Sequence, residues 1–334
     1  MEKESSEILA YLDHNILDSL VKGDCFDVKG LLEKNECVVV FSDENIKEIE
    51  KSKGYEQKFL EVLKDLKARH ITPIVDKNFF PTGTAKVTIV DPFETYNSYL
   101  KNVDPMPKMG YGLSGMLQKS YGGLEGTSFE DVAKNGAQEL KDYLNKSLEC
   151  IDNVEGLDPK LKNSLKEFFA QVPDIVEESG RDLANQLDSD SEESQIRQFE
   201  EATGVGPRTL KNIKGPNVLV KVWDSIRKGL PDVELDLETF FGIKPARWSP
   251  NPERELTVLE KVNAIYHQLN FLGYYRDSNM KTVREFNASF SDMTHAGLAS
   301  FCQLLIGSDT NLIMKASAAY EYLGLSTKIV FIKR

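Results

Sequence analysis

The sequence predicts an α/β fold, in which a Rossmann-like parallel sheet is flanked by helices and split by a mainly helical insertion. Short apolar runs alternate with segments of helical periodicity over residues 1–80, and the same alternation returns over residues 251–334. Strands that are separated by helices pair in parallel, because each crossover helix carries the chain back to the same end of the sheet. The residues between the two parts show mainly helical periodicity.

The first part alternates three expected strands with two expected helices. The stretch CVVVFS at residues 37–42 is the strongest strand signal, because it combines β-branched side chains with an apolar run. Ser42 and Asp43 form a helix N-cap signal ahead of a long charged segment. In chain order we expect a strand at 8–13, a helix at 15–22, a strand at 37–42, a helix at 44–69 and a strand at 71–75.

The last part follows the same pattern. It contains two further apolar runs short enough to be strands, and the segments around them have helical periodicity. In chain order we expect a helix at 253–272, a helix at 292–302, a strand at 304–308, a helix at 311–323 and a strand at 328–332.

The domain organisation follows from the number of strands. Neither part alone offers enough strands for a stable sheet, whereas the two together reach the common size of one domain. We therefore expect one α/β domain built from residues 1–80 and 251–334, with a helical insertion over residues 81–250. Two domains in sequence are the alternative.

The composition excludes several classes of protein. The 334 residues include 41 Lys and Arg against 53 Asp and Glu, a net charge of −12, which argues against a protein that grips nucleic acid by bulk charge. No apolar run approaches the roughly 18–20 residues that span a bilayer, so we expect no membrane partner. The amino-terminal residues lack a signal-peptide pattern, and the four cysteines are scattered. Both features predict a reduced, cytoplasmic protein.

Four acidic residues stand where a doubly wound sheet places its ligands, beyond the carboxyl ends of strands. Asp13 and Asp309 each close an apolar run, Glu48 lies on the helix after the second strand, and Asp292 is expected to open a helix. Carboxylates that converge cannot all stay ionised without a cation. An all-oxygen site suits Mg²⁺ or Mn²⁺, and such ions can activate water for phosphodiester hydrolysis.

A surface position is the simpler interpretation for any single acid in so acidic a chain. Glu48 taken alone would be assigned to the surface, because Asp43, Glu44 and Glu50 surround it in the sequence. Asp13 and Asp309 differ from it, because an acid that closes a buried strand is less often incidental.

Three sequence blocks resemble those of the PIN-domain nucleases. These are YLDHNIL at 11–17, FSDENIKEIEKS at 41–52 and SDMTHAGLASFCQLLIGSDTNLIMKA at 291–316. The resemblance implies a metal-dependent nuclease, most often one that acts on RNA, with Asp13, Glu48, Asp292 and Asp309 as metal ligands. It also implies that Asn15, Ser42 and Ser308 hold these acids in place by hydrogen bonds.

The chain departs from the family pattern at three points. His14 stands where the family often has Thr, and Asn311 occupies a position that is sometimes a further acid. The central insertion is the largest departure, and it leaves the choice of substrate open.

Two basic residues near the third and fourth acids each allow a functional and a structural interpretation. His295 lies three residues after Asp292 on the same helix face, so it either orients Asp292 or contacts a substrate phosphate, unless it is a surface or capping histidine. Lys315 either reaches a phosphate from the helix after Asp309 or is a surface lysine with a buried stem.

A possible nucleic-acid contact occurs within the insertion. Residues 201–214 (EATGVGPRTLKNIK) resemble a helix-hairpin-helix element, in which backbone N–H groups at a helix start bind a phosphate. The residues in question are Gly204, Gly206, Arg208 and Lys211. An ordinary turn between two helices is the alternative.

The expected function is therefore divalent-metal-dependent cleavage of nucleic acid, RNA rather than DNA, by an endoribonuclease that acts as a toxin or defence effector. A DNA or flap nuclease that uses the hairpin element is one alternative, and a catalytically silent PIN-like scaffold is another. The insertion is expected to meet a protein partner or inhibitor, and a homo-oligomer is also consistent with the sequence.

Overall fold

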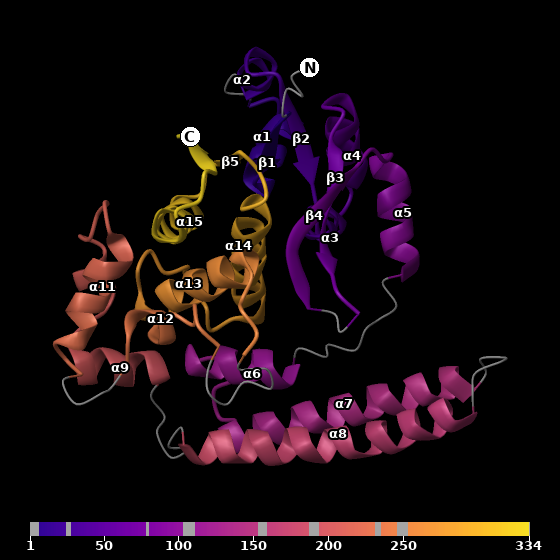
Figure 1. The fold of residues 1–334 in the computed structure, drawn as a ribbon, viewed down its shortest axis with the longest axis vertical. Helices are drawn as coiled ribbons and strands as arrows, with labels where there is room; N and C mark the ends of the chain where they lie inside the picture. Colours follow the sequence, from indigo (N-terminus) through magenta and orange to yellow (C-terminus); the bar gives the residue numbers. More distant parts are fainter. Residues whose placement is uncertain are drawn as a thin grey trace. The chain divides into compact units, whose positions relative to one another are not determined.

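The fold is that of an α/β protein built on a six-stranded, mostly parallel sheet (Figure 1). The computed structural model describes residues 7–24, 28–77, 80–102, 111–152, 159–186, 194–230, 235–245 and 253–333. Within them the strand order is β4-β3-β2-β1-β5-β6. All neighbouring strands are parallel except β3 and β4.

The amino-terminal elements form one side of the sheet. Strand β1 (Ile8–Leu12) pairs with β2 (Cys37–Phe41), and Tyr11 lies opposite Val40. The other elements of this part, in chain order, are α1 (His14–Lys22), α2 (Val28–Lys34), α3 (Asp43–Lys51), α4 (Glu56–Asp65), β3 (Arg69–Val75), β4 (Pro81–Thr88) and α5 (Pro92–Asn102).

The carboxyl-terminal elements extend the sheet on the opposite side of β1. Strand β5 (Leu304–Gly307) pairs with β1 and with β6 (Lys328–Phe331). The helices of this part are α13 (Val258–Leu272), α14 (Val283–Ala299) and α15 (Thr310–Leu323).

Two expectations about the sheet were wrong. Residues 81–88 form β4 rather than the start of a helical insertion, and β4 is antiparallel to β3, so the sheet is not parallel throughout. The stretch PTGTAKVT is rich in β-formers, and its proline stands at the first position of an edge strand, where a missing N–H is tolerated.

The helix expected at 44–69 is two helices, α3 and α4. The break falls at Lys53 and Gly54, which both have positive φ angles (20° and 89°). A left-handed backbone cannot continue a right-handed helix, and glycine adopts it at little cost.

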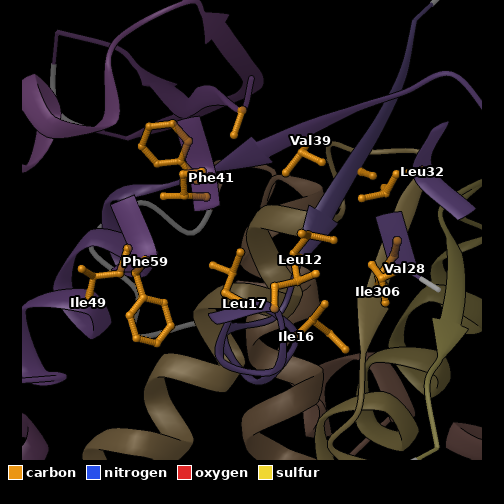
Figure 2. Packing of buried hydrophobic residues seen from close by; sticks show 14 of the residues in the cluster. Leu12, Ile16, Leu17, Val28, Leu32, Val39, Phe41, Ile49, Phe59 and Ile306 are labelled. Carbon is orange, nitrogen blue, oxygen red and sulfur yellow. The ribbon is translucent and has the colours of Figure 1, made fainter. Parts of the chain in front are cut away.

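The helices pack on both faces of the sheet, because side chains alternate along each strand. Ala10, Leu12, Val39 and Phe41 face one core, and Ile306 of β5 belongs to it (Figure 2). Helices α1 to α4 supply nearly all the other buried members, which include Ile16, Leu17, Val28, Leu32, Ile49 and Phe59. Each fully buried aliphatic side chain stabilises the fold by about 1.5–3 kcal/mol.

The opposite face of the sheet meets the carboxyl-terminal helices. Tyr11 points to this side, where its hydroxyl contacts His295 of α14. Helix α15 adjoins α14, because the Tyr320 hydroxyl donates to the Ala296 carbonyl. This second face positions the candidate site.

The chain divides into two compact units. The first consists of Met1–Asn102, Ala202–Asp277 and Ala288–Arg334, and it contains the whole sheet. The second consists of Val103–Glu201 and Ser278–Asn287. The expected boundaries at 81 and 250 are therefore displaced, because β4 and α5 belong with the sheet and so do residues 202–250.

The remaining helices are distributed over both units. In the second unit, α7 (Phe129–Asp152) and α8 (Pro159–Gln186) pack along each other, and the absence of a side chain at Gly180 lets α8 approach Ala133 closely. The others are α6 (Tyr111–Ser120), α9 (Gln195–Thr203), α10 (Pro207–Leu210), α11 (Val218–Arg227) and α12 (Leu237–Phe240). None of the helices in the described ranges is long and apolar enough to cross a membrane.

Candidate functional site

The candidate site lies where the strand order reverses. Strands β2 and β3 follow β1 in sequence and lie on one side of it in the sheet, whereas β5, which comes much later in the sequence, lies on its other side. Ligands of doubly wound sheets bind beyond the carboxyl ends of strands at such a point. Asp13 follows β1 directly, and its backbone N–H donates to the Ile306 carbonyl of β5 at 2.9 Å. Asp309 follows β5, so these two acids come from neighbouring strands.

Asp309 also begins α15. Its Oδ1 accepts a hydrogen bond of 2.9 Å from the Leu312 backbone N–H, which makes it the N-cap of this helix. The strand-to-helix turn therefore fixes the carboxyl group at the edge of the sheet. Asp13 also stands at a strand-to-helix junction, but its carboxylate does not cap α1.

Glu48 is brought to the same region by α3. Ser42 begins this helix with a capping box, in which the Asn45 side chain accepts from the Ser42 N–H at 2.9 Å and from its Oγ at 3.1 Å. The expectation that Ser42 holds one of the acids is not met, because its other partner is the Tyr11 hydroxyl at 2.7 Å. Ser42 thus holds the helix that carries Glu48.

Asp292 lies within a helix rather than at its start. Helix α14 begins at Val283, so the expected loop at 287–291 is helical. The polar side chains that suggested a loop serve contacts between elements instead. Ser289 hydrogen-bonds Asn270 and Asp277, and the Ser291 hydroxyl lies 2.7 Å from Glu44 Oε1 and 2.8 Å from Glu48 Oε1, so that the two carboxylates share its single proton.

The acids act on one another electrostatically. Burial raises the pKa of Asp13 to about 6, and the charges of Glu48 and Asp309 add to the rise although His295 opposes it. Burial likewise raises the pKa of Asp292 well above its usual range, and the charges of Asp13, Asp309 and Glu48 contribute. The four predicted acids are therefore close enough to influence one another, and at least two of them are costly to ionise.

Glu48 behaves differently because a buried histidine faces it. His295 is fully buried, and its Nε2 lies 2.8 Å from Glu48 Oε2 while its Nδ1 lies 2.7 Å from the Tyr11 hydroxyl. Burial alone would raise the pKa of Glu48, but the hydrogen bond and charge of His295, aided by His14 and Ser291, lower it to about 2. The same pairing raises the pKa of His295 despite its burial.

The geometry resolves the two interpretations of His295. It neither orients Asp292 nor lies at the surface, and its partners are Glu48 and Tyr11. The Tyr11 hydroxyl bridges onward to Ser42, so a continuous row of hydrogen bonds runs from Glu48 to the start of α3. Glu48 is thus fixed in position and stays ionised.

Lys315 is buried rather than exposed. Its Nζ donates to Asp277 at 2.7 Å and to Asn270 at 2.9 Å, and it lies 4.4 Å from the ring centroid of Tyr266. Burial lowers the pKa of Lys315, and the charges of Asp277, Asp292 and Asp309 oppose that shift. In this arrangement the ammonium group is engaged inside the protein, so neither the surface interpretation nor the phosphate contact describes it.

Among the other predicted residues, only Asn15 touches an acid as expected. Its Nδ2 donates to Asp13 Oδ2 at 3.2 Å. Ser308 is half-buried, and no hydrogen bond to an acid is present at this residue within the described ranges. His14 Nδ1 lies 3.4 Å from Glu48 Oε2, and the Asn311 Nδ2 donates to the Arg276 carbonyl at 3.4 Å.

The hairpin segment contains a shorter second helix than its resemblance predicts. Gly204 has a φ of 69° and Gly206 caps α10, but α10 is a single turn of four residues. Arg208 and Lys211 are exposed beside it. The segment is therefore a turn between α9 and one helical turn, without the two full helices of a helix-hairpin-helix element.

Several residues of the site had little signal in the sequence. Tyr11 looked like a core residue, although a buried tyrosine hydroxyl usually has a polar partner, which was the available clue. Ser291, Glu44 and Asp277 lie in segments that looked like loop or charged surface. Their roles depend on contacts between distant elements, which spacing along the chain does not reveal.

The donor set fits a hard divalent cation. All its candidate ligand atoms are carboxylate oxygens. Asp13 accepts one hydrogen bond, from Asn15, and no hydrogen bond within the described chain reaches the Asp292 carboxylate. Among the residues that the structure describes, no group of three or more His, Cys, Asp or Glu side chains is arranged to hold a metal directly. Mg²⁺ needs only one or two protein carboxylates, because it keeps several waters or binds substrate phosphate. The residues therefore suit an ion that is held partly through water.

Comparison of the chain with protein-family models, with curated proteins and with solved structures finds no match in any of the three.

Proposed function

We propose that this protein is a PIN-like nuclease that hydrolyses phosphodiester bonds with the help of Mg²⁺ or Mn²⁺. One observation carries the proposal: Asp13, Asp292, Asp309 and Glu48 come from separate elements and influence one another at the switch point of the sheet. Two of these carboxyl groups have strongly raised pKa values. A divalent cation would relieve their mutual repulsion.

The four acids have different roles in this proposal. Asp13, Asp292 and Asp309 hold the cation, either directly or through water. Glu48 stays ionised because its pKa is about 2, which suits a ligand and does not suit a general base near neutral pH. A divalent cation held by these residues would supply a Lewis acid, which lowers the pKa of water and offsets negative charge on the phosphate.

The buried partners keep these acids in place. His295 and Ser291 hold the two oxygens of Glu48, Asn15 holds Asp13, and the cap of α15 holds one oxygen of Asp309. Catalytic and metal-binding groups depend on such supporting contacts for their orientation.

RNA is the substrate that the resemblance to PIN-domain nucleases favours, and a toxin or defence role in the cytoplasm remains part of the proposal. A DNA or flap nuclease receives less support, because α10 is too short for the helix-hairpin-helix element it would use. Retention of all four acids favours an enzyme over a silent scaffold. We assign the capture of a protein partner or inhibitor, which the sequence analysis placed on the insertion, to the helices of the second unit.

The test is cleavage of mixed single-stranded RNA and DNA, with and without Mn²⁺ or Mg²⁺. Asp13→Asn and Asp309→Asn should each abolish metal-dependent cleavage. Asn preserves an oxygen for the Asn15 contact and for the cap of α15, so both variants should remain folded. Cleavage at the wild-type rate by both variants would remove the site assignment.

A further inference from the structure

An unsatisfied buried hydroxyl lies beside the acids. Tyr266 of α13 is 1% exposed, and its hydroxyl has no hydrogen-bond partner among the described residues. Leaving such a group unpaired in the interior destabilises the fold, because the hydrogen bonds that it made with water are lost. A buried tyrosine hydroxyl normally has a partner, so its lack of one here requires an explanation.

The register between α13 and α14 sets Tyr266 opposite Asp292. The two helices run antiparallel, and three contacts fix their alignment. A side chain at Gly297 would collide with Asn263, the rings of His267 and Phe290 lie 5.7 Å apart, and Asn270 donates to Ser289 at 3.1 Å. The same alignment places Tyr266 across from Asp292, between the first and last of these contacts.

The electrostatics agree with this placement. Burial raises the pKa of the Tyr266 phenol well above its usual range, and among the charged neighbours Asp292 has the largest effect, ahead of Asp277 and Asp309. The ring itself is held in place, because the Lys315 ammonium lies over its face at 4.4 Å from the centroid. A fixed ring aims the hydroxyl in one direction.

We propose that Tyr266 is a positioning residue for the cation site, whose hydroxyl donates a hydrogen bond to the Asp292 carboxylate when the cation is bound. Asp292 accepts no hydrogen bond in the described chain, and Tyr266 donates none. The two groups are complementary, because a carboxylate oxygen accepts hydrogen bonds and a phenol hydroxyl donates one. This inference rests on the proposed function.

The experiment is a calorimetric titration of the full-length protein with Mn²⁺, comparing Tyr266→Phe with Tyr274→Phe. Tyr274 is the matched control, since it is 0% exposed, its hydroxyl also lacks a partner in the described chain, and its charged neighbours are Tyr275 and Glu321 rather than the acids of the site. Tyr266→Phe should weaken Mn²⁺ binding about 10-fold or more, the usual effect of removing a partner of a metal ligand. Tyr274→Phe should leave the affinity unchanged.

A spectroscopic measurement separates positioning from a merely structural role. Mn²⁺ should produce a tyrosine ultraviolet difference spectrum in the wild type and in Tyr274→Phe, but not in Tyr266→Phe. The metal-free Tyr266→Phe protein should melt no lower than the wild type, because the substitution removes an unpaired hydroxyl and keeps the ring. Unchanged Mn²⁺ affinity, a retained difference spectrum or an equal loss in both variants would overturn the inference.

Failure of this inference is distinguishable from failure of the proposed function through Asp13→Asn. Suppose that the wild type binds Mn²⁺ and that Asp13→Asn does not. If Tyr266→Phe then binds Mn²⁺ as tightly as the wild type, only the role of Tyr266 is wrong. If the wild type itself binds no Mn²⁺, both proposals are wrong.

Discussion

Among single residues, Asp13 and Glu48 have pKa values that are shifted in opposite directions. Asp13 is buried with one hydrogen-bond donor, whereas Glu48 has a histidine and a serine on its two oxygens. Burial therefore raises the pKa of Asp13 to about 6, while the partners of Glu48 outweigh burial and lower its pKa to about 2. The two acids should consequently affect folding in opposite directions.

Replacing Asp13 by Asn should stabilise the metal-free protein above about pH 6. A carboxyl whose pKa is raised in the folded state opposes folding once it is ionised, and this cost disappears below about pH 4, where the group is protonated in both states. The expected gain at about pH 8 is on the order of 1–3 kcal/mol, and it should shrink towards zero at low pH. Urea unfolding of the wild type and the variant, with a chelator present, measures this gain at about pH 8 and at low pH. A loss of stability at the higher pH would mean that Asp13 serves a structural ion pair.

Replacing Glu48 by Gln should destabilise the protein near neutral pH. A carboxyl whose pKa is lowered in the folded state contributes stability that is present above its unfolded value of about 4.5 and is lost as the pH falls towards 2. The expected loss near pH 7 is on the order of 2–3 kcal/mol, and the gap to the wild type should narrow below about pH 4. The same unfolding series tests this, and a gap independent of pH would contradict the role given to His295.

At the scale of elements, Asp309 combines two functions that can be separated. It caps α15 through the Leu312 N–H, and we assign it to the cation site. Asp309→Asn should keep the cap and lose Mn²⁺ affinity, whereas Asp309→Ala should lose both and cost about 0.5–2 kcal/mol of stability. Thermal unfolding and calorimetry on the two variants check this. If the wild type and Asp309→Asn bind Mn²⁺ with equal affinity, Asp309 caps α15 but is not part of the cation site.

At the scale of the whole molecule, the cation site should be independent of the second unit. All four acids and their partners lie in the unit that contains the sheet. Gly180→Leu should disturb the close packing of α8 on Ala133 of α7, at a cost of about 1–3 kcal/mol for an overpacked contact. Mn²⁺ affinity should nevertheless stay at the wild-type value. A matching loss of Mn²⁺ affinity would show that the second unit helps to build the site.

The sequence predicted every strand of the sheet except β4, for physical reasons. Runs such as CVVVFS are buried strands in almost any context, so β1, β2, β5 and β6 were recognisable. The edge strand β4 has no fully buried residue, and such a strand carries no clear apolar pattern. The break at Gly54 depends on positive φ angles, which one glycine in a charged helical segment signals only weakly.

For the candidate site, the sequence located the acids but not their partners. Asp13, Glu48 and Asp309 follow strands or open helices, so topology alone brings them together. Asp292 was identified although its helix was misjudged, because Ser289 and Ser291 read as loop when their side chains in fact bond other elements. The pairing of His295 with Glu48 and of Lys315 with Asp277 depends on tertiary contacts, which no local pattern specifies.

The most direct measurement is an anomalous diffraction map of crystals of the full-length protein soaked in Mn²⁺. We expect a peak at the switch point of the sheet, near the carboxylates of Asp13, Asp292 and Asp309, and the loss of that peak in Asp13→Asn crystals. A map with no peak there, in crystals that diffract equally well and bind Mn²⁺ elsewhere, would contradict it.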